Sequence, residues 1–97
     1  SVYLWGGSGV GKTHLLQGAC QRAVFLGGAS MYISLKNKGK MKPSDLQGLE
    51  QLDLVCIDDL DAIAKDAAWE EALFHLYNRM RAENKHLLLS GLQPPQS

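Results

Sequence analysis

The sequence predicts an α/β fold: a three-layer sandwich in which a parallel sheet carries helices on both faces. Two observations support this prediction. A strand, a glycine loop and a helix open the chain, and strand-like and helix-like apolar periods then alternate along its 97 residues. Such alternation implies right-handed crossovers between parallel strands. A chain of this length forms one domain.

The first half of the chain is expected to supply two strands and one helix. Residues 2–5 are a short apolar run directly before the glycines, which indicates a buried strand. From Lys12 onward apolar residues recur every three or four positions, which predicts an amphipathic helix that stops at the glycines 27 and 28. Its apolar stripe consists of Leu15, Leu16, Ala19, Cys20, Ala23 and Val24. Residues 30–35 are the second predicted strand.

The second half predicts two more strands and two helices. Ser44 and Gln47 fit a capping box that starts a short helix reaching about residue 51. Residues 52–57 form a near-continuous apolar run, which is typical of a strand covered on both faces. Asp66 is the expected N-cap of a long helix that ends near Asn84 and buries Trp69, Leu73, Leu76 and Met80. Residues 86–90 are the fourth strand.

Composition excludes several classes of protein. Ten Lys and Arg balance ten Asp and Glu, so bulk electrostatic attraction to nucleic acid or membrane is excluded, and we expect no direct DNA binding by this chain. No apolar run approaches the roughly 20 residues that span a bilayer. Cys20 and Cys56 fall on apolar faces and are expected in the core, which fits a reducing, cytoplasmic setting.

Residues 6–13 match the phosphate-loop pattern G-x-x-x-x-G-K-[ST]. Glycines let successive backbone N–H groups turn toward a triphosphate, and the following helix offers its unpaired N–H groups to the same anion. Lys12 is expected to place its ammonium between the β- and γ-phosphates, and the Thr13 hydroxyl to bind Mg²⁺. The predicted nucleotide-binding residues are Gly6, Gly7, Ser8, Gly9, Val10, Gly11, Lys12, Thr13 and His14. The alternative, a chance glycine turn, conflicts with the strand before it and the helix after it.

An acidic pair follows the third predicted strand. Asp58 is expected to hold Mg²⁺ together with Thr13, and Asp59 is the candidate catalytic residue that orients an attacking water. The pair read alone also fits a solvated turn rich in aspartate. Ser90, at the end of the fourth strand, either senses the γ-phosphate or is a simple turn former.

Other polar residues have simpler interpretations. Lysines 36, 38, 40 and 42 are expected in a solvated loop, because no aromatic residue lies among them for stacking on bases. His14 either approaches the nucleotide or packs on the helix. His75 and His86 lack metal-binding spacing with the cysteines.

Residues 3–17, with residues 53–60 and 69–79, resemble AAA+ ATPases of the DnaA family, and within it most resemble the Hda-type regulators. The similarity covers about residues 3–95. It implies a sheet in the order 5-1-4-3-2, and ATP or ADP bound between the phosphate loop and a partner subunit. It also implies homo-oligomer formation and a role in switching DnaA from its ATP to its ADP state, together with the DNA-loaded sliding clamp.

The resemblance leaves alternatives open. Only residues 36–51 separate the second strand from the apolar run at 52, where DnaA itself carries a longer helical insertion, so the regulator is favoured. A DnaA-type initiator or a DnaC-like helicase loader is the alternative, and a truncated chain that binds nothing well is a third. Leu92 departs from the Asp that relatives often carry near Ser90. We expect the 97 residues to be a partial domain, truncated after the fourth strand before the fifth strand, arginine finger, second sensor and lid, so hydrolysis by the chain alone is not expected.

Overall fold

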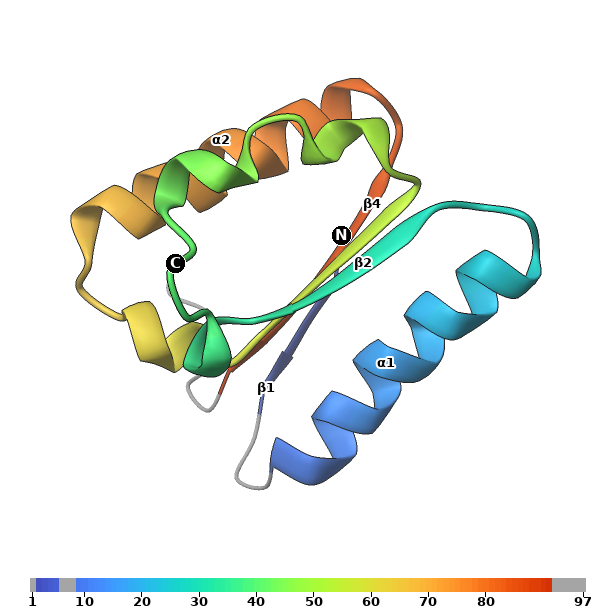
Figure 1. Cartoon of the computed structure of the whole chain (residues 1–97), viewed down its shortest axis with the longest axis horizontal. Coiled ribbons are helices and arrows are strands. Elements are labelled where there is room, and N and C mark those ends of the chain that lie inside the picture. Colours follow the sequence, from blue (N-terminus) through green and yellow to red (C-terminus); the bar gives the residue numbers. More distant parts are fainter. Residues whose placement is uncertain (1, 6–8, 92–97) are drawn as a thin grey trace.

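The computed structural model describes residues 2–5 and 9–91, which form a four-stranded parallel sheet between two helical layers (Figure 1). In sheet order the strands are β1 (Val2–Trp5), β4 (His86–Gly91), β3 (Leu54–Asp58) and β2 (Ser30–Ser34). Every neighbouring pair is parallel. The predicted α/β fold class is confirmed, and so is the expected order of these four strands. Their carboxyl ends therefore meet at one edge of the sheet.

Helix α1 (Gly9–Phe25) covers one face of the sheet, and Figure 1 shows it on the side opposite α2. It begins at Gly9, three residues before the expected start at Lys12, because glycines in a first turn give no periodic apolar signal. Its buried stripe is also narrower than predicted. Leu16 and Cys20 are buried, whereas Leu15 and Val24 are more than half exposed.

Helix α2 (Ala67–Ala82) covers the other face, and its predicted cap is confirmed; three of the four predicted stripe residues are buried, and Leu73 is only partly buried at the edge of the core. The Asp66 carboxylate accepts the backbone N–H of Trp69, which satisfies a donor that the first helical turn leaves unpaired. Trp69, Leu76 and Met80 are buried against the sheet. The helix carries Arg79 and Arg81 in its last turn, as the helix dipole favours.

The position of β3 between two covered faces of the sheet explains why its sequence is continuously apolar. Val55 and Ile57 enter the core under α2, whereas Leu54 and Cys56 enter the smaller core under α1. Alternate side chains of a strand point to opposite faces, and both faces are covered here. Cys20 and Cys56 are buried, unpaired thiols, as predicted.

The short helix predicted over residues 44–51 is wrong. The chain forms two 3₁₀ turns instead, η2 (Pro43–Leu46) and η3 (Leu49–Gln51), separated by Gly48 at a φ of 91°. A left-handed residue between the turns prevents one continuous helix. Ser44 is not the N-cap either: Lys42 is, and its backbone N–H donates to Asp45 Oδ2 at 2.8 Å.

Two more 3₁₀ turns complete the fold, η1 (Leu35–Asn37) after β2 and η4 (Leu60–Ile63) after β3. Leu35 and Ile63 bury their side chains in the core under α2. Among the residues that the structure describes, no helix is long and apolar enough to cross a membrane.

Candidate nucleotide and magnesium site

Asp58 is the centre of the candidate site. It ends β3 at the carboxyl edge of the sheet, and 2% of its surface is exposed. Its Oδ2 accepts hydrogen bonds from the Thr13 and Tyr32 hydroxyls, each at 2.6 Å. Its Oδ1 accepts the Ser90 hydroxyl and the Asp59 backbone N–H, the latter at 3.0 Å. Three strands and the start of α1 thus converge on one carboxylate.

These donors keep Asp58 ionised. Burial raises the pKa of its carboxyl, but hydrogen bonds from Ser90, Thr13, Tyr32 and the backbone outweigh burial and leave the pKa below its usual range. A carboxylate offers about four acceptor positions. The four donors occupy both oxygens, so the orientation of the group is fixed from both sides.

Asp59 is held apart from its neighbour. Its backbone has a φ of 61°, a left-handed conformation that Asp tolerates better than most residues. Its Oδ2 accepts the Ser34 hydroxyl at 2.7 Å, and Asn37 Nδ2 donates to that hydroxyl oxygen at 3.5 Å. The two adjacent carboxylates therefore have separate sets of side-chain donors, and Asp59 is the more exposed of the two.

A cavity of about 600 Å³ opens beside the acidic pair. Its walls come from the start of α1, the carboxyl end of β2, η1 and the turn after β3, and every residue that lines it carries a polar or charged group. The lining residues are Thr13, His14, Gln17, Tyr32, Ser34, Lys36, Asn37 and Asp59. His14 is exposed and lines this cavity.

The structure places most of the predicted site residues at one edge of the sheet. Residues 9–13 form the start of α1, where the N–H groups of a first helical turn lack partners within the helix. Ser90 is 1% exposed and donates to Asp58, so it is more than a turn former. Gly6, Gly7 and Ser8 of the loop, and Leu92 after β4, lie outside the described residues.

Tyr32 and Ser34 were missed by the sequence reasoning. Both side chains leave β2 on the same face, since they are two residues apart, and each reaches one member of the acidic pair. The signal was present, because a hydroxyl pair two residues apart at the end of one parallel strand must approach the end of its neighbour. The expected strand order already placed the second strand beside the third, but the sequence reasoning did not follow its hydroxyl side chains to the acidic pair.

The oxygen atoms at this edge fit magnesium. Mg²⁺ prefers hard oxygen ligands and combines one or two protein groups with water and phosphate oxygens. The Thr13 hydroxyl lies 2.6 Å from an ionised carboxylate oxygen, which supplies both an oxygen ligand and a balancing charge. Among the described residues, no cluster of three or more His, Cys, Asp or Glu could hold a metal by itself.

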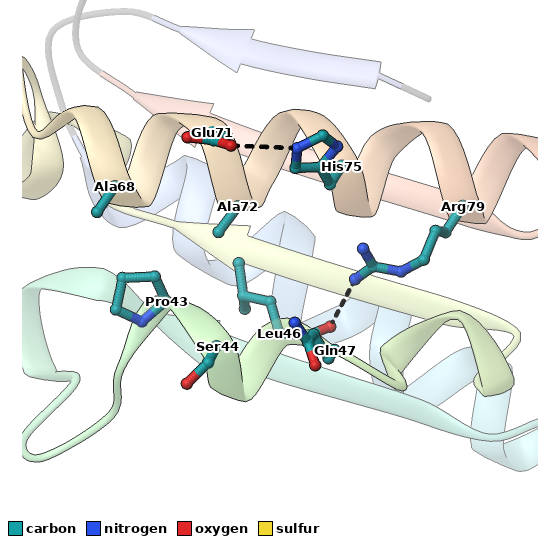
Figure 2. Close-up of a pocket in the computed structure, with 9 residues that line it drawn as sticks. All are labelled: Pro43, Ser44, Leu46, Gln47, Ala68, Glu71, Ala72, His75 and Arg79. Atoms are coloured by element: carbon teal, nitrogen blue, oxygen red, sulfur yellow. Dashed lines mark hydrogen bonds and ion pairs between the residues drawn. The ribbon is translucent and has the colours of Figure 1, made fainter.

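A second cavity of about 420 Å³ lies between α2 and η2 (Figure 2). Arg79 closes one end of it: its Nε donates to Glu50 Oε1 at 2.8 Å and its Nη2 to the Leu46 carbonyl oxygen at 3.1 Å. The Arg79 hydrogen bond holds the pKa of the Glu50 carboxyl below its usual range. The guanidinium thus fastens η2 and η3 to α2.

The fold and the arrangement of Thr13, Asp58 and Ser90 define the class of protein: a parallel α/β domain with a hydroxyl–carboxylate cluster at the carboxyl edge of its sheet. The family described as the bacterial DnaA ATPase domain matches residues 1–97. The chain therefore belongs to the DnaA ATPase domain family.

Solved structures of DnaA share this fold. Domain III of the Thermotoga maritima replication initiation protein DnaA matches with a TM-score of 0.78 and 25% identity, over 99% of this chain and 45% of that one. DnaA from Aquifex aeolicus bound to AMPPCP matches with a TM-score of 0.79 and 24% identity, over 95% of this chain and 32% of that one. A Neisseria meningitidis protein matches with a TM-score of 0.66 and 27% identity, over 98% and 60%. The chain thus spans about a third of the Aquifex DnaA structure.

Proposed function

We propose that this chain binds ATP or ADP, with Mg²⁺, at the carboxyl edge of its sheet. The observation that carries the proposal is the hydrogen bond between Thr13 and Asp58, which joins two motifs 45 residues apart in the sequence. The glycine loop predicts phosphate binding, and the acidic pair predicts magnesium binding when it is combined with that loop, so a bond between the two motifs is what a shared site requires. The similar Aquifex DnaA structure contains AMPPCP, which supports a nucleotide as the ligand.

Each predicted residue has a role in this proposal. Residues 6–14 surround the phosphates, with the Lys12 ammonium near the β- and γ-phosphates. Thr13 and Asp58 hold Mg²⁺, which supplies charge neutralisation for the phosphates when bound. Asp59, exposed to the cavity beside Thr13, orients a water molecule, and Ser90 responds to the γ-phosphate.

Nucleotide binding is tested with the Lys12→Ala variant. Titration of the chain with a fluorescent ATP analogue should show a Kd that rises roughly tenfold or more in the variant, since hydrogen bonds to charged groups contribute about 1.5–3 kcal/mol. Lys40→Ala is the matched control, because Lys40 is exposed in the loop after β2 and should leave the Kd unchanged. Equal affinity of the parent and Lys12→Ala would refute the site assignment.

We further propose that the chain is the first part, from the phosphate loop to the fourth strand, of the ATPase core of an Hda-like regulator that promotes inactivation of DnaA. Residues 35–53, between β2 and β3, form only 3₁₀ turns, and the shortness of this segment supports the regulator over an initiator with a longer helical insertion. The proposed partners are DnaA, the DNA-loaded sliding clamp and further copies of the protein, and the proposed setting is the cytoplasm.

A DnaA-type initiator or a DnaC-like helicase loader is the alternative. A DnaA structure similar to this chain is bound to AMPPCP and single-stranded DNA. Fluorescence anisotropy with a labelled single strand separates the two functions. The regulator predicts no binding to the strand and nucleotide-dependent binding to immobilised DnaA, whereas tight binding to the strand would favour the alternative.

A further inference from the structure

The side chain of Tyr32 reaches the candidate magnesium site from the middle of β2. Its hydroxyl donates to Asp58 Oδ2 at 2.6 Å, the same oxygen that accepts the Thr13 hydroxyl. Tyr32 pairs in register with Cys56, two residues before Asp58 along β3. The phenol ring therefore spans the distance from the sheet interior to its carboxyl edge, where its oxygen meets the carboxylate.

The ring is anchored in the core. Tyr32 packs against the cluster of Leu16, Cys20, Leu54 and Cys56 under α1. A phenol has one donor hydrogen at the end of a rigid ring, so a fixed ring fixes the direction of its hydrogen bond. A phenol keeps its proton at neutral pH, so the Tyr32 hydroxyl is the donor to Asp58.

The other donors leave Oδ2 dependent on Tyr32. Ser90 and the Asp59 N–H both bind Oδ1, and they hold only one end of the carboxylate. Thr13 also donates to Oδ2, but Thr13 is itself a proposed Mg²⁺ ligand. A different donor is therefore needed to hold the carboxylate in place relative to Thr13. Tyr32 is the remaining side-chain donor to this oxygen among the described residues.

We propose that Tyr32 is a positioning residue for the magnesium site. Its hydroxyl holds the Asp58 carboxylate in an orientation in which Oδ2 faces the Thr13 hydroxyl and the cation. This inference rests on the proposed nucleotide and magnesium binding. It assigns a role to a β2 residue that lies in neither sequence motif. Groups that orient metal ligands from outside the coordination sphere typically change metal affinity about 10–100-fold when they are removed.

Tyr32→Phe tests the proposal because it removes the hydroxyl and keeps the ring that packs against the cluster under α1. The affinity for a fluorescent ATP analogue is measured over a series of Mg²⁺ concentrations and in excess EDTA. The Mg²⁺ concentration for half-maximal enhancement of binding should rise about tenfold or more. The affinity in EDTA should stay within about twofold of the parent, since no phosphate contact is removed. Tyr77→Phe is the matched control: it makes the same change on α2, on the opposite face of the sheet, and should alter neither quantity.

Four outcomes would overturn the proposal. An unchanged Mg²⁺ requirement would show that Thr13, Ser90 and the backbone align Asp58 without Tyr32. Equal loss of affinity with Mg²⁺ and in EDTA, or loss of the folded far-UV circular dichroism spectrum, would assign the hydroxyl a structural role only. If the parent chain binds no nucleotide under either condition, the proposed function itself fails and this inference fails with it. A parent that binds in a Mg²⁺-dependent way and an unaffected Tyr32→Phe would instead refute the inference alone.

Discussion

Ser90 allows a quantitative test of how the site is built into the fold. Substituting Ser90→Ala removes the hydroxyl that donates to Asp58 Oδ1, and both residues are almost fully buried. The carboxylate keeps Thr13, Tyr32 and one backbone N–H as donors, so it stays charged but loses one partner in a site that water reaches poorly.

The expected loss of stability follows from these contacts. A hydrogen bond to a charged group contributes about 1.5–3 kcal/mol. The second Ser90 contact, from the Asp59 N–H to Oγ at 3.4 Å, is long and adds little. We therefore expect a loss of about 2 kcal/mol, and since 1 kcal/mol shifts the Tm of a 60–100-residue domain by about 4–8 °C, a Tm lower by about 8–16 °C.

Thermal melts followed by circular dichroism at neutral pH measure this shift directly. Ser44→Ala is the control, because Ser44 is exposed on η2 and its hydrogen bond from the Gln47 N–H goes to its backbone carbonyl oxygen, which the substitution keeps. Its Tm should stay close to that of the parent, as for most surface substitutions. A Ser90→Ala melt that matches the Ser44→Ala melt would refute the reasoning and would return Ser90 to the role of a turn former.

Three further predictions use other parts of the fold. Gly91→Ala should destabilise the chain by about 1–3 kcal/mol in urea unfolding, because a Cβ there would lie 2.5 Å from the Tyr3 hydroxyl oxygen. Gly18→Ala should instead stabilise the chain by about 0.5–1 kcal/mol, because a Cβ at this position on α1 meets nothing within 4 Å. Changes of the same sign in both variants would contradict the packing argument. Glu50→Gln should lower the free energy of unfolding at pH 7, because the Arg79 hydrogen bond holds the pKa of the folded Glu50 carboxyl below its usual range. The difference in unfolding free energy between variant and parent should shrink as the pH falls below about 4.3, since protonation of Glu50 removes the ion pair. A difference that stays constant from pH 7 to pH 3 in urea unfolding would argue against the ion pair. Burial raises the pKa of the Cys56 thiol, so iodoacetamide should alkylate this residue slowly in the native chain and rapidly in urea. Mass spectrometry measures both alkylation rates. Equal rates would show that Cys56 is accessible to solvent in the native chain.

The elements were predictable where a local pattern is strong. The stripe of α2 and the Asp66 cap identified that helix, and the continuous apolar run identified β3 as a strand with two covered faces. Prediction failed at residues 44–51, where a helix was expected and two 3₁₀ turns formed. Gly48 adopts a positive φ there, which interrupts the helix. The prediction relied on the capping pattern at Ser44 and did not treat this glycine as a helix breaker.

The sequence by itself determined the chemical groups of the candidate site. Spacing alone fixed the glycine loop ahead of a helix and the acidic pair after a buried strand, because both patterns depend on neighbours within a few residues. Thr13 and Asp58 were expected to meet, but only the tertiary structure showed that Tyr32 and Ser90 also donate to the same carboxylate. Thr13, Tyr32, Asp58 and Ser90 are separated by up to 77 positions along the chain, and they converge only because four parallel strands end at one edge in the order β1-β4-β3-β2. Strand order depends on contacts between distant segments, which no local pattern records, and for that reason the role of the Tyr32 hydroxyl became visible only in the folded sheet.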